Sequence, residues 1–333
     1  MQYLITGAAG FIGSYLCHKL AKEGNKIVAV DSYSSYYDVE LKKYRVKELL
    51  EPLSIDVVNL DITDDIKFDN LVSISKPDVV INLAAQAGVR LPLNETDKYV
   101  NSNLVGFSNV LRSTVNNKVP YFLYASSSSV YGDKAAIPYI ESEQNLHPNS
   151  FYGATKLANE LLTPTLIQNS STAARGLRFF TVYGPWGRPD MAYFRMIANV
   201  ISGAEFNFFG DGSVERDFTF IDDAVDSVIG LTTELRKRKP GYSDVVNLGG
   251  SRPLSMSFLL QTVNTISKSE VKFNRLNSNL NDAKKTMSDS KYIESLIASK
   301  PSTKLEDGIA KTIEWAMRGD ISSNLNNWVK SVQ

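Results

Sequence analysis

Tyr152 and Lys156 lie four residues apart in the segment Tyr152-Gly153-Ala154-Thr155-Lys156. Residues at this spacing share one face of a helix, so the phenol and the ammonium can point into the same pocket. A tyrosine has a pKa of about 10, and a neighbouring ammonium lowers it toward a phenolate that can remove a proton. The same spacing occurs at Tyr15 and Lys19, which we interpret as an ordinary helix face. The spacing alone is therefore weak evidence for a base.

Four consecutive serines, Ser126 to Ser129, add to the case for chemistry near Tyr152. They follow the apolar segment Tyr121–Ala125, which we expect to be a buried strand. Serines are common in turns, where the hydroxyl bonds to the local backbone. Four hydroxyls directly after a buried strand are unusual for a turn and favour a site.

A glycine-rich loop near the N-terminus indicates where a cofactor binds. We expect a strand at Gln2–Thr6, a helix that ends near Glu23, and a strand at Lys26–Val30 that leads to Asp31. Glycines allow the tight turn and let helix amides approach a pyrophosphate, while Asp31 can accept hydrogen bonds from an adenosine ribose. A carboxylate there repels a 2′-phosphate and so favours NAD over NADP. The loop has the spacing G-x-x-G-x-x-G and supplies Gly7, Gly10, Phe11, Ile12 and Gly13.

Strands and helices continue to alternate beyond this unit. We expect strands at Ile55–Leu60, Asp78–Leu83 and Tyr121–Ala125, with helices near Asp65–Ser73 and Asp97–Val115 between them. This order predicts an α/β protein with a Rossmann-like, doubly wound parallel sheet, whose ligands bind at the carboxyl ends of the strands. The residues expected at these ends to contact the cofactor are Asp61, Ile62, Ala84, Ala85 and Ser126.

Composition excludes several classes of function. The chain has 333 residues, and its 36 Lys and Arg balance its 36 Asp and Glu, so we expect no nucleic-acid or anionic-membrane partner. The only cysteine, Cys17, cannot form an internal disulfide, and two histidines give no cluster of metal ligands. No apolar run approaches the ~20 residues that span a bilayer. We predict a soluble, cytoplasmic protein without a metal site.

Taken together, these motifs resemble the extended short-chain dehydrogenases/reductases, and among them the nucleotide-sugar epimerases. The resemblance implies that Ser127, shortly before Val130-Tyr131-Gly132, aids proton transfer. It implies that Tyr152 is the base and that Lys156 supports it and holds the nicotinamide ribose. Asn103 matches a structural asparagine near the cofactor.

The positions after Ser127 narrow the chemistry that this resemblance implies. Relatives that dehydrate or decarboxylate the sugar carry carboxylates there, because those reactions need a further acid or base. This chain has Ser128 and Ser129, which favours simple epimerisation at carbon 4. The segments 36–39, 84–90 and 178–191 resemble UDP-glucuronate 4-epimerases.

The same resemblance suggests how a UDP-sugar is held. A carboxylate would be bound by Ser128, Ser129, Thr181 and Arg188, and Arg90 lies in one of the matching segments. Asp190 and Met191 would line the diphosphate, Phe209 would lie near the uracil, and Arg216 would pair with a phosphate. The segment Asn279–Asp282 departs from the family pattern, in which an arginine or glutamine binds the second phosphate; Arg275 is the only arginine close to it in sequence.

The expected reaction is an oxidation at carbon 4 that is then reversed. Tyr152 takes the proton of the 4-hydroxyl, NAD takes and returns the hydride, and a transient 4-keto sugar turns over in between. UDP-glucuronate to UDP-galacturonate is the favoured conversion. Two alternatives remain: a 4-epimerase of neutral UDP-hexoses or UDP-N-acetylhexosamines, and a catalytically silent NAD-binding regulatory protein. Intact Ser127, Tyr152 and Lys156 disfavour the silent protein.

We predict two structural parts. Residues 1–180, with parts of 217–250 returning to them, form the NAD-binding domain, and residues 181–333 form mainly a smaller C-terminal α/β domain for the nucleotide sugar. The resemblance also implies a homodimer, formed through the helices expected at Asp97–Val115 and Ser150–Asn169. Helices are expected in the second part at Ala192–Ser202, Asp223–Arg236, Ser255–Ser267 and Glu306–Met317, and a strand at Val245–Leu248.

Overall fold

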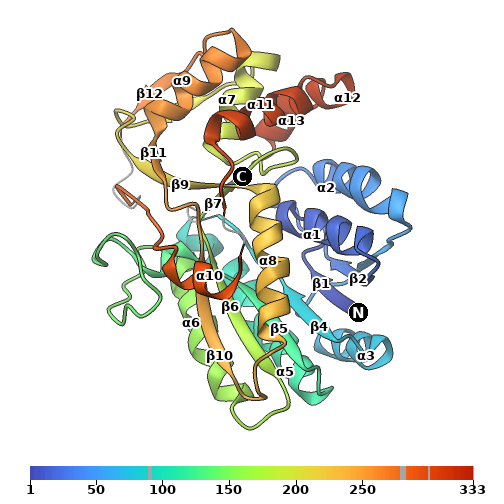
Figure 1. Ribbon diagram of the computed structural model, residues 1–333. Coiled ribbons are helices and arrows are strands. Elements are labelled where there is room, and N and C mark those ends of the chain that lie inside the picture. The colour runs from blue at the N-terminus through green and yellow to red at the C-terminus, as the bar shows by residue number, and fades with distance from the viewer. Residues whose placement is uncertain (89–91, 278–282, 299–300, 333) are drawn as a thin grey trace.

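A computed structural model describes residues 1–88, 92–277, 283–298 and 301–332. Its larger layer is a seven-stranded sheet in the order β10-β6-β5-β4-β1-β2-β3 (Figure 1), with every neighbouring pair parallel. The predicted doubly wound parallel sheet is confirmed. Its strands are β1 (Gln2–Thr6), β2 (Lys26–Asp31), β3 (Val57–Asn59), β4 (Val79–Asn82), β5 (Tyr121–Ser127), β6 (Ala173–Phe179) and β10 (Ser243–Leu248).

Helices cover both faces of this sheet. Along β1, Tyr3 and Ile5 belong to one core with residues of α1 (Phe11–Lys22) and α8 (Ile221–Leu235), while Leu4 belongs to the other. This alternation follows from the period of two in a strand. The second core is formed with α3 (Asp65–Ser75), α5 (Phe107–Asn116) and α6 (Phe151–Ile167).

The smaller layer lies above the sheet in Figure 1. A three-stranded sheet in the order β11-β9-β7 adjoins a two-stranded parallel ribbon, β12-β8. These strands are β7 (Thr181–Tyr183), β8 (Asn207–Phe209), β9 (Glu215–Phe220), β11 (Pro253–Ser255) and β12 (Asn274–Leu276). The helices of this layer are α7 (Ala192–Ser202), α9 (Met256–Ser267), α11 (Leu305–Ala316), α12 (Gly319–Ser322) and α13 (Leu325–Lys330).

The chain passes between the two layers more than once. After β9, the chain returns through α8 and β10 to the large sheet, while α10 (Lys291–Leu296) packs on β10. At the C-terminus, α13 lies against α2 (Val39–Arg45), where the rings of Trp328 and Tyr44 are 5.7 Å apart. The exact division of the chain near residue 180 stays a prediction.

Three local features differ from the sequence analysis. The helix expected at Asp97–Val115 begins as α4 (Thr96–Tyr99), continues as a π-helical stretch at Val100–Gly106, and only then becomes α5. The helix α2 and its π-helical continuation to Leu50 were not predicted, because the buried Lys42 and Arg45 interrupt the apolar pattern. The strand β6 was not identified for a similar reason, since it carries two buried arginines.

Among the residues that the structure describes, no helix is both long and apolar enough to cross a membrane. The same part of the chain contains no group of three or more His, Cys, Asp or Glu side chains that could hold a metal ion.

Candidate active site

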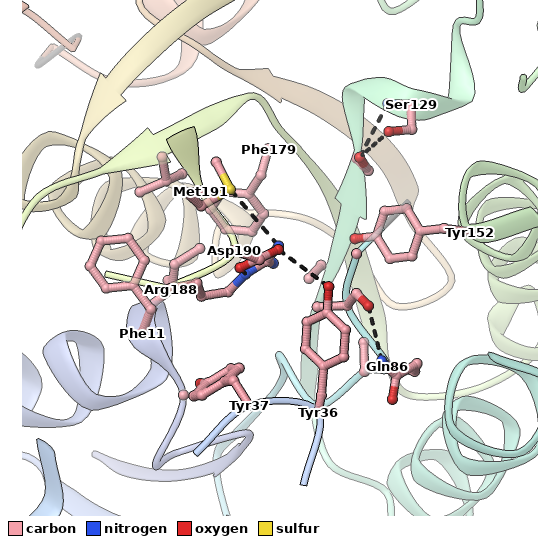
Figure 2. Close-up of a pocket in the computed structure, with 18 of the residues that line it drawn as sticks. Phe11, Tyr36, Tyr37, Gln86, Ser129, Tyr152, Phe179, Arg188, Asp190 and Met191 are labelled. Carbon is pink, nitrogen blue, oxygen red and sulfur yellow. Dashed lines mark hydrogen bonds and ion pairs between the residues drawn. The ribbon is translucent and has the colours of Figure 1, made fainter. Parts of the chain in front are cut away.

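A cavity of about 1580 Å³ opens at the carboxyl ends of the large sheet, where the smaller layer meets it. The glycine loop and the ends of β2, β4 and β5 line one side, and residues of β7, β8 and β9 line the other. Ligands of open α/β sheets bind at this edge. Both layers therefore contribute to one binding site (Figure 2).

The glycine loop fits a dinucleotide phosphate because side chains are excluded from it. Gly7 has φ of +72°, a conformation that favours glycine. A Cβ on Gly13 would lie 2.1 Å from the Gly7 carbonyl oxygen, and one on Gly10 would lie 2.9 Å from the same atom. No side chain caps the N-terminus of α1, so its first N–H groups face the loop. Phe11 and Ile12 line the cavity beside these glycines.

Asp31 lies at the end of β2, where the sequence places the adenosine ribose. Its carboxylate accepts hydrogen bonds from the backbone N–H groups of Ala9 (3.0 Å) and Tyr33 (2.7 Å). The ammonium of Lys42, on α2, lies 3.9 Å from the same carboxylate. Lys42 is buried and lines the cavity, yet the sequence analysis missed it because α2 itself was not predicted.

Four further residues that we expect to contact the cofactor line the cavity: Asp61, Ile62, Ala84 and Ala85. Asn103 does not line the cavity but is buried next to it. Its side-chain amide donates to the Gln86 carbonyl oxygen (3.2 Å) and the Thr155 hydroxyl (3.1 Å), and its Oδ1 accepts from the Gln86 N–H (2.8 Å). Asn103 thus fastens the loop after β4 to α6, which carries Tyr152 and Lys156.

The N-terminal turn of α6 positions Tyr152 and Lys156. Ser150 caps the helix by accepting a hydrogen bond from the Gly153 N–H (3.0 Å). The Lys156 ammonium donates to the Ala125 carbonyl oxygen (2.9 Å) and lies 5.6 Å from the centre of the Tyr152 ring. Both side chains line the cavity, as the spacing predicts.

The electrostatics of this pair differ from our expectation. Burial raises the pKa of Tyr152 above its ordinary value, and the charge of Arg188 and a hydrogen bond with Ser127 only partly oppose this effect. Burial also lowers the pKa of Lys156 to about 8. In this structure the pKa of Tyr152 therefore lies above its ordinary value and not below it as we expected, because desolvation favours the neutral form of both groups.

The four serines at the end of β5 and in the turn that follows it divide into two groups. The Ser126 hydroxyl donates to Glu160, which forms an ion pair with the buried Arg178 (2.8 Å). Ser127 lies beside Ser129, with 3.1 Å between their hydroxyl oxygens, and Ser128 lines the same cavity. The sequence analysis did not identify this ion pair, because a single carboxylate in a helix and a single arginine in a strand form no recognisable motif.

Arg188, Asp190 and Tyr36 form a connected group opposite Tyr152. Arg188 donates through Nε (3.0 Å) and Nη2 (2.6 Å) to the two oxygens of Asp190, and the Tyr36 hydroxyl donates to Asp190 (3.3 Å). Burial alone would raise the pKa of Asp190, but Arg188 holds it below its ordinary value. In Figure 2, the rings of Tyr36 and Tyr152 point toward the space beside this ion pair.

The remaining substrate candidates also lie at the cavity, with one exception. Arg90 lies outside the described residues, as does the segment 279–282. Arg45 was missed: it is fully buried and donates to the carbonyl oxygens of Trp186 (2.8 Å) and Gly187 (2.9 Å), which fixes the segment before Arg188. The candidates that line the cavity are Thr181, Met191, Phe209 and Arg216.

Residues 3–249 match the model of the NAD dependent epimerase/dehydratase family. The chain belongs to this family. It is an enzyme whose cofactor is NAD, and the resemblance described in the sequence analysis is confirmed. The glycine loop, Asp31 and the Tyr152–Lys156 pair, which we expect to contact this cofactor, line one cavity.

Relatives of the epimerase/dehydratase family match nearly the full chain. Protein CapI of Staphylococcus aureus is 36% identical, over 95% of this chain and 98% of its own length. UDP-glucuronate 4-epimerase 5 of Arabidopsis thaliana is 37% identical, over 95% of this chain and 76% of its own length. The crystal structure of UDP-glucuronic acid 4-epimerase from Bacillus cereus, in complex with UDP-glucuronic acid and NAD, has a TM-score of 0.86 at 32% identity and covers 95% of this chain and 98% of that one.

Proposed function

We propose that this enzyme is a UDP-sugar 4-epimerase that interconverts UDP-glucuronate and UDP-galacturonate. The observation that carries the proposal is the position of Arg188, which lines the same cavity as Tyr152 and acts on its pKa. Thr181, Ser128 and Ser129 line that cavity too and can donate hydrogen bonds to a carboxylate. The relatives named as UDP-glucuronate 4-epimerases support the same substrate.

In this proposal, the Tyr152 side chain exchanges the proton of the sugar 4-hydroxyl. Its hydrogen bond with Ser127 and the charge of Arg188 stabilise the phenolate that removes this proton. Bound NAD supplies the acceptor, and later the donor, of the hydride at carbon 4. The Lys156 ammonium donates a hydrogen bond to the Ala125 carbonyl oxygen, and this bond fixes the lysine side chain between the end of β5 and Tyr152.

A uronic acid oxidised at carbon 4 is a β-keto acid, which loses carbon dioxide when its carboxylate bond aligns with the carbonyl π system. An epimerase for this sugar must therefore hold the carboxylate out of alignment. We assign this role to Arg188, Thr181, Ser128 and Ser129. Because Asp190 binds two nitrogens of Arg188, the direction of the guanidinium is fixed before substrate arrives.

One observation favours a second candidate, a 4-epimerase of neutral UDP-hexoses or UDP-N-acetylhexosamines. Asp190 forms an ion pair with Arg188 and so compensates part of the positive charge in the cavity. The test incubates the enzyme with NAD and with UDP-glucuronate, UDP-glucose or UDP-N-acetylglucosamine, and follows products by proton NMR. UDP-galacturonate alone supports the first proposal, conversion of only neutral sugars supports the second, and a UDP-pentose would contradict the carboxylate role.

We also propose a homodimer formed through the outer faces of α4–α5 and α6. Large apolar side chains are exposed on α6, namely Leu161 (66%), Phe151 (44%) and Leu166 (44%). On α6, these residues follow a helical period on the side turned away from the sheet. A second copy that packs the same face against them would bury these side chains. The cytoplasmic location stays a prediction from the sequence.

A further inference from the structure

We infer that Arg195 binds the diphosphate of the nucleotide sugar together with Arg216, an inference that rests on the proposed UDP-sugar substrate. A diphosphate carries at least two negative charges, and paired guanidinium groups are well suited to bind it. The sequence leaves the second of these groups unassigned, because the segment 279–282 offers no arginine or glutamine.

Arg195 has the geometry that this role requires. It lies in the first turn of α7 and lines the cavity. Its Nε donates to the Pro189 carbonyl oxygen (3.2 Å), which directs the side chain along the wall of the cavity. Within the described ranges, neither of its terminal nitrogens has a hydrogen-bond or ion-pair partner. Arg195 therefore offers two N–H-bearing nitrogens and a full charge to a ligand.

The position of Arg195 along the cavity suits the middle of a UDP-sugar. The α7 helix begins directly after Arg188 and Asp190, at the end of the cavity that holds Tyr152. The same helix leads into β8, which carries Phe209 at the end assigned to the uracil. A substrate with its sugar at Tyr152 and its base at Phe209 would place its diphosphate between these ends, within reach of α7.

Arg216 approaches this region from β9. Its Nη1 donates to the carbonyl oxygens of Glu215 (2.9 Å) and Ala283 (2.7 Å), and its side chain lines the cavity. These bonds to backbone help to fix the position of the guanidinium. Arg195 and Arg216 thus come from two different elements of the smaller layer and share one cavity.

Arg275, the arginine closest in sequence to the segment 279–282, is directed elsewhere. Its guanidinium lies over the rings of Phe208 (5.5 Å) and Phe273 (5.6 Å) and donates to the Gly210 carbonyl oxygen (3.0 Å). It is not among the residues that line the cavity. Arg275 therefore serves as a matched control of the same residue type.

The experiment measures binding of UDP, UMP and uridine to the NAD-loaded enzyme by calorimetry. We expect Arg195→Gln to weaken UDP by at least tenfold, to weaken UMP less, and to leave uridine unchanged, while Arg275→Gln binds all three as the wild type does. The salt dependence of UDP binding should also become shallower in Arg195→Gln, because one charge contact is lost. Arg195→Lys should recover part of the affinity, and thermal unfolding checks that each variant is folded.

Several outcomes would overturn the inference. Wild-type affinity for UDP in Arg195→Gln would remove Arg195 from the site, and an equal loss in Arg275→Gln would show that the charge acts at a distance. If the wild type binds UDP but turns over no UDP-sugar, the proposed function fails while the diphosphate site stands. If the wild type binds no UDP, both are wrong.

Discussion

Arg188 and Asp190 form a two-point ion pair at the wall of the cavity, with Nε and Nη2 of the guanidinium 3.0 Å and 2.6 Å from the two carboxylate oxygens. Tyr36 donates to the same carboxylate. Within the described part of the chain, Nη1 of Arg188 has no hydrogen-bond partner. The pair therefore orients the guanidinium and leaves one of its nitrogens for a ligand. It also places a positive charge where it favours the Tyr152 phenolate.

Substitution of Arg188 by Gln should move the acid limb of the kcat–pH profile to higher pH by roughly one unit, because a nearby cation lowers the pKa of a phenol. Loss of that charge leaves burial, which raises the pKa of Tyr152, less opposed. The same variant should release more decarboxylated pentose from UDP-glucuronate. Initial rates between pH 6 and pH 10, with NMR of the products, measure both effects.

Asp190→Asn is the matched comparison, because it keeps the Arg188 charge. Its acid limb should stay in place or move to lower pH, while the free energy of unfolding falls by roughly 1–3 kcal/mol as a partly buried ion pair loses one partner. If both variants moved the limb upward, the effect would come from disturbed packing and not from the charge of Arg188.

Gly13→Ala should abolish tight NAD binding and lower the unfolding temperature. An added Cβ would lie 2.1 Å from the Gly7 carbonyl oxygen, so the loop must shift away from the start of α1. Gly319→Ala is the control, since a Cβ there meets nothing within 4 Å and its φ is not positive. NAD affinity, measured by calorimetry, should fall at least a hundredfold in the first variant and stay unchanged in the second. Equal affinities would contradict the role of the loop.

The sequence predicted the sheet and most of the cavity because these parts follow local rules. The glycine loop follows β1, Asp31 ends β2, and Tyr152 and Lys156 lie four residues apart at the start of α6, so each motif lies within one short segment. Topology then brings the strand ends to one edge. The cofactor side could be predicted without knowledge of any long-range contact.

The parts that were missed depend on contacts between distant segments. Arg45 binds carbonyl oxygens more than a hundred residues away, and Lys42 is near Asp31 only because α2 packs over the end of β2. Buried charges disrupt the apolar periodicity from which helices are identified. The pKa of Tyr152 was also misjudged, since the number of atoms that bury a phenol is not visible in a sequence.

The dimer proposal predicts that Leu161→Lys together with Leu166→Lys gives a folded monomer. Both leucines are exposed on α6, so their loss should not disturb the core of the subunit. Ile74, on α3, is 82% exposed and lies on a different helix, so Ile74→Lys is the control and should not change the assembly. Light scattering after gel filtration gives the mass of each variant. A wild-type enzyme that elutes as a monomer would contradict the proposal directly.

In the absence of added NAD and near pH 7, the Lys156→Met variant should be more stable than the wild type, although the substitution removes a residue expected in catalysis. Burial lowers the pKa of Lys156 to about 8 in the folded state, whereas a lysine in the unfolded chain titrates near 10.5. The unfolded state therefore binds more protons between these values, and the wild-type free energy of unfolding rises with pH across that window. Below pH 8, the burial of the charged Lys156 lowers the wild-type free energy of unfolding by at most about 3 kcal/mol. The variant avoids this loss but also lacks the hydrogen bond to Ala125, which offsets about 1 kcal/mol of its gain in stability.

Urea unfolding at pH 7 and pH 10 measures the difference between wild type and Lys156→Met. We expect the variant to be more stable by roughly 1–2 kcal/mol at pH 7 and to lose this advantage at pH 10, because the wild-type lysine is then neutral in the folded state. Lys19→Met is the control, since that side chain is partly exposed and paired with Asp226. A pH-independent difference would mean that Lys156 stays charged in its pocket, held by a partner stronger than the carbonyl of Ala125.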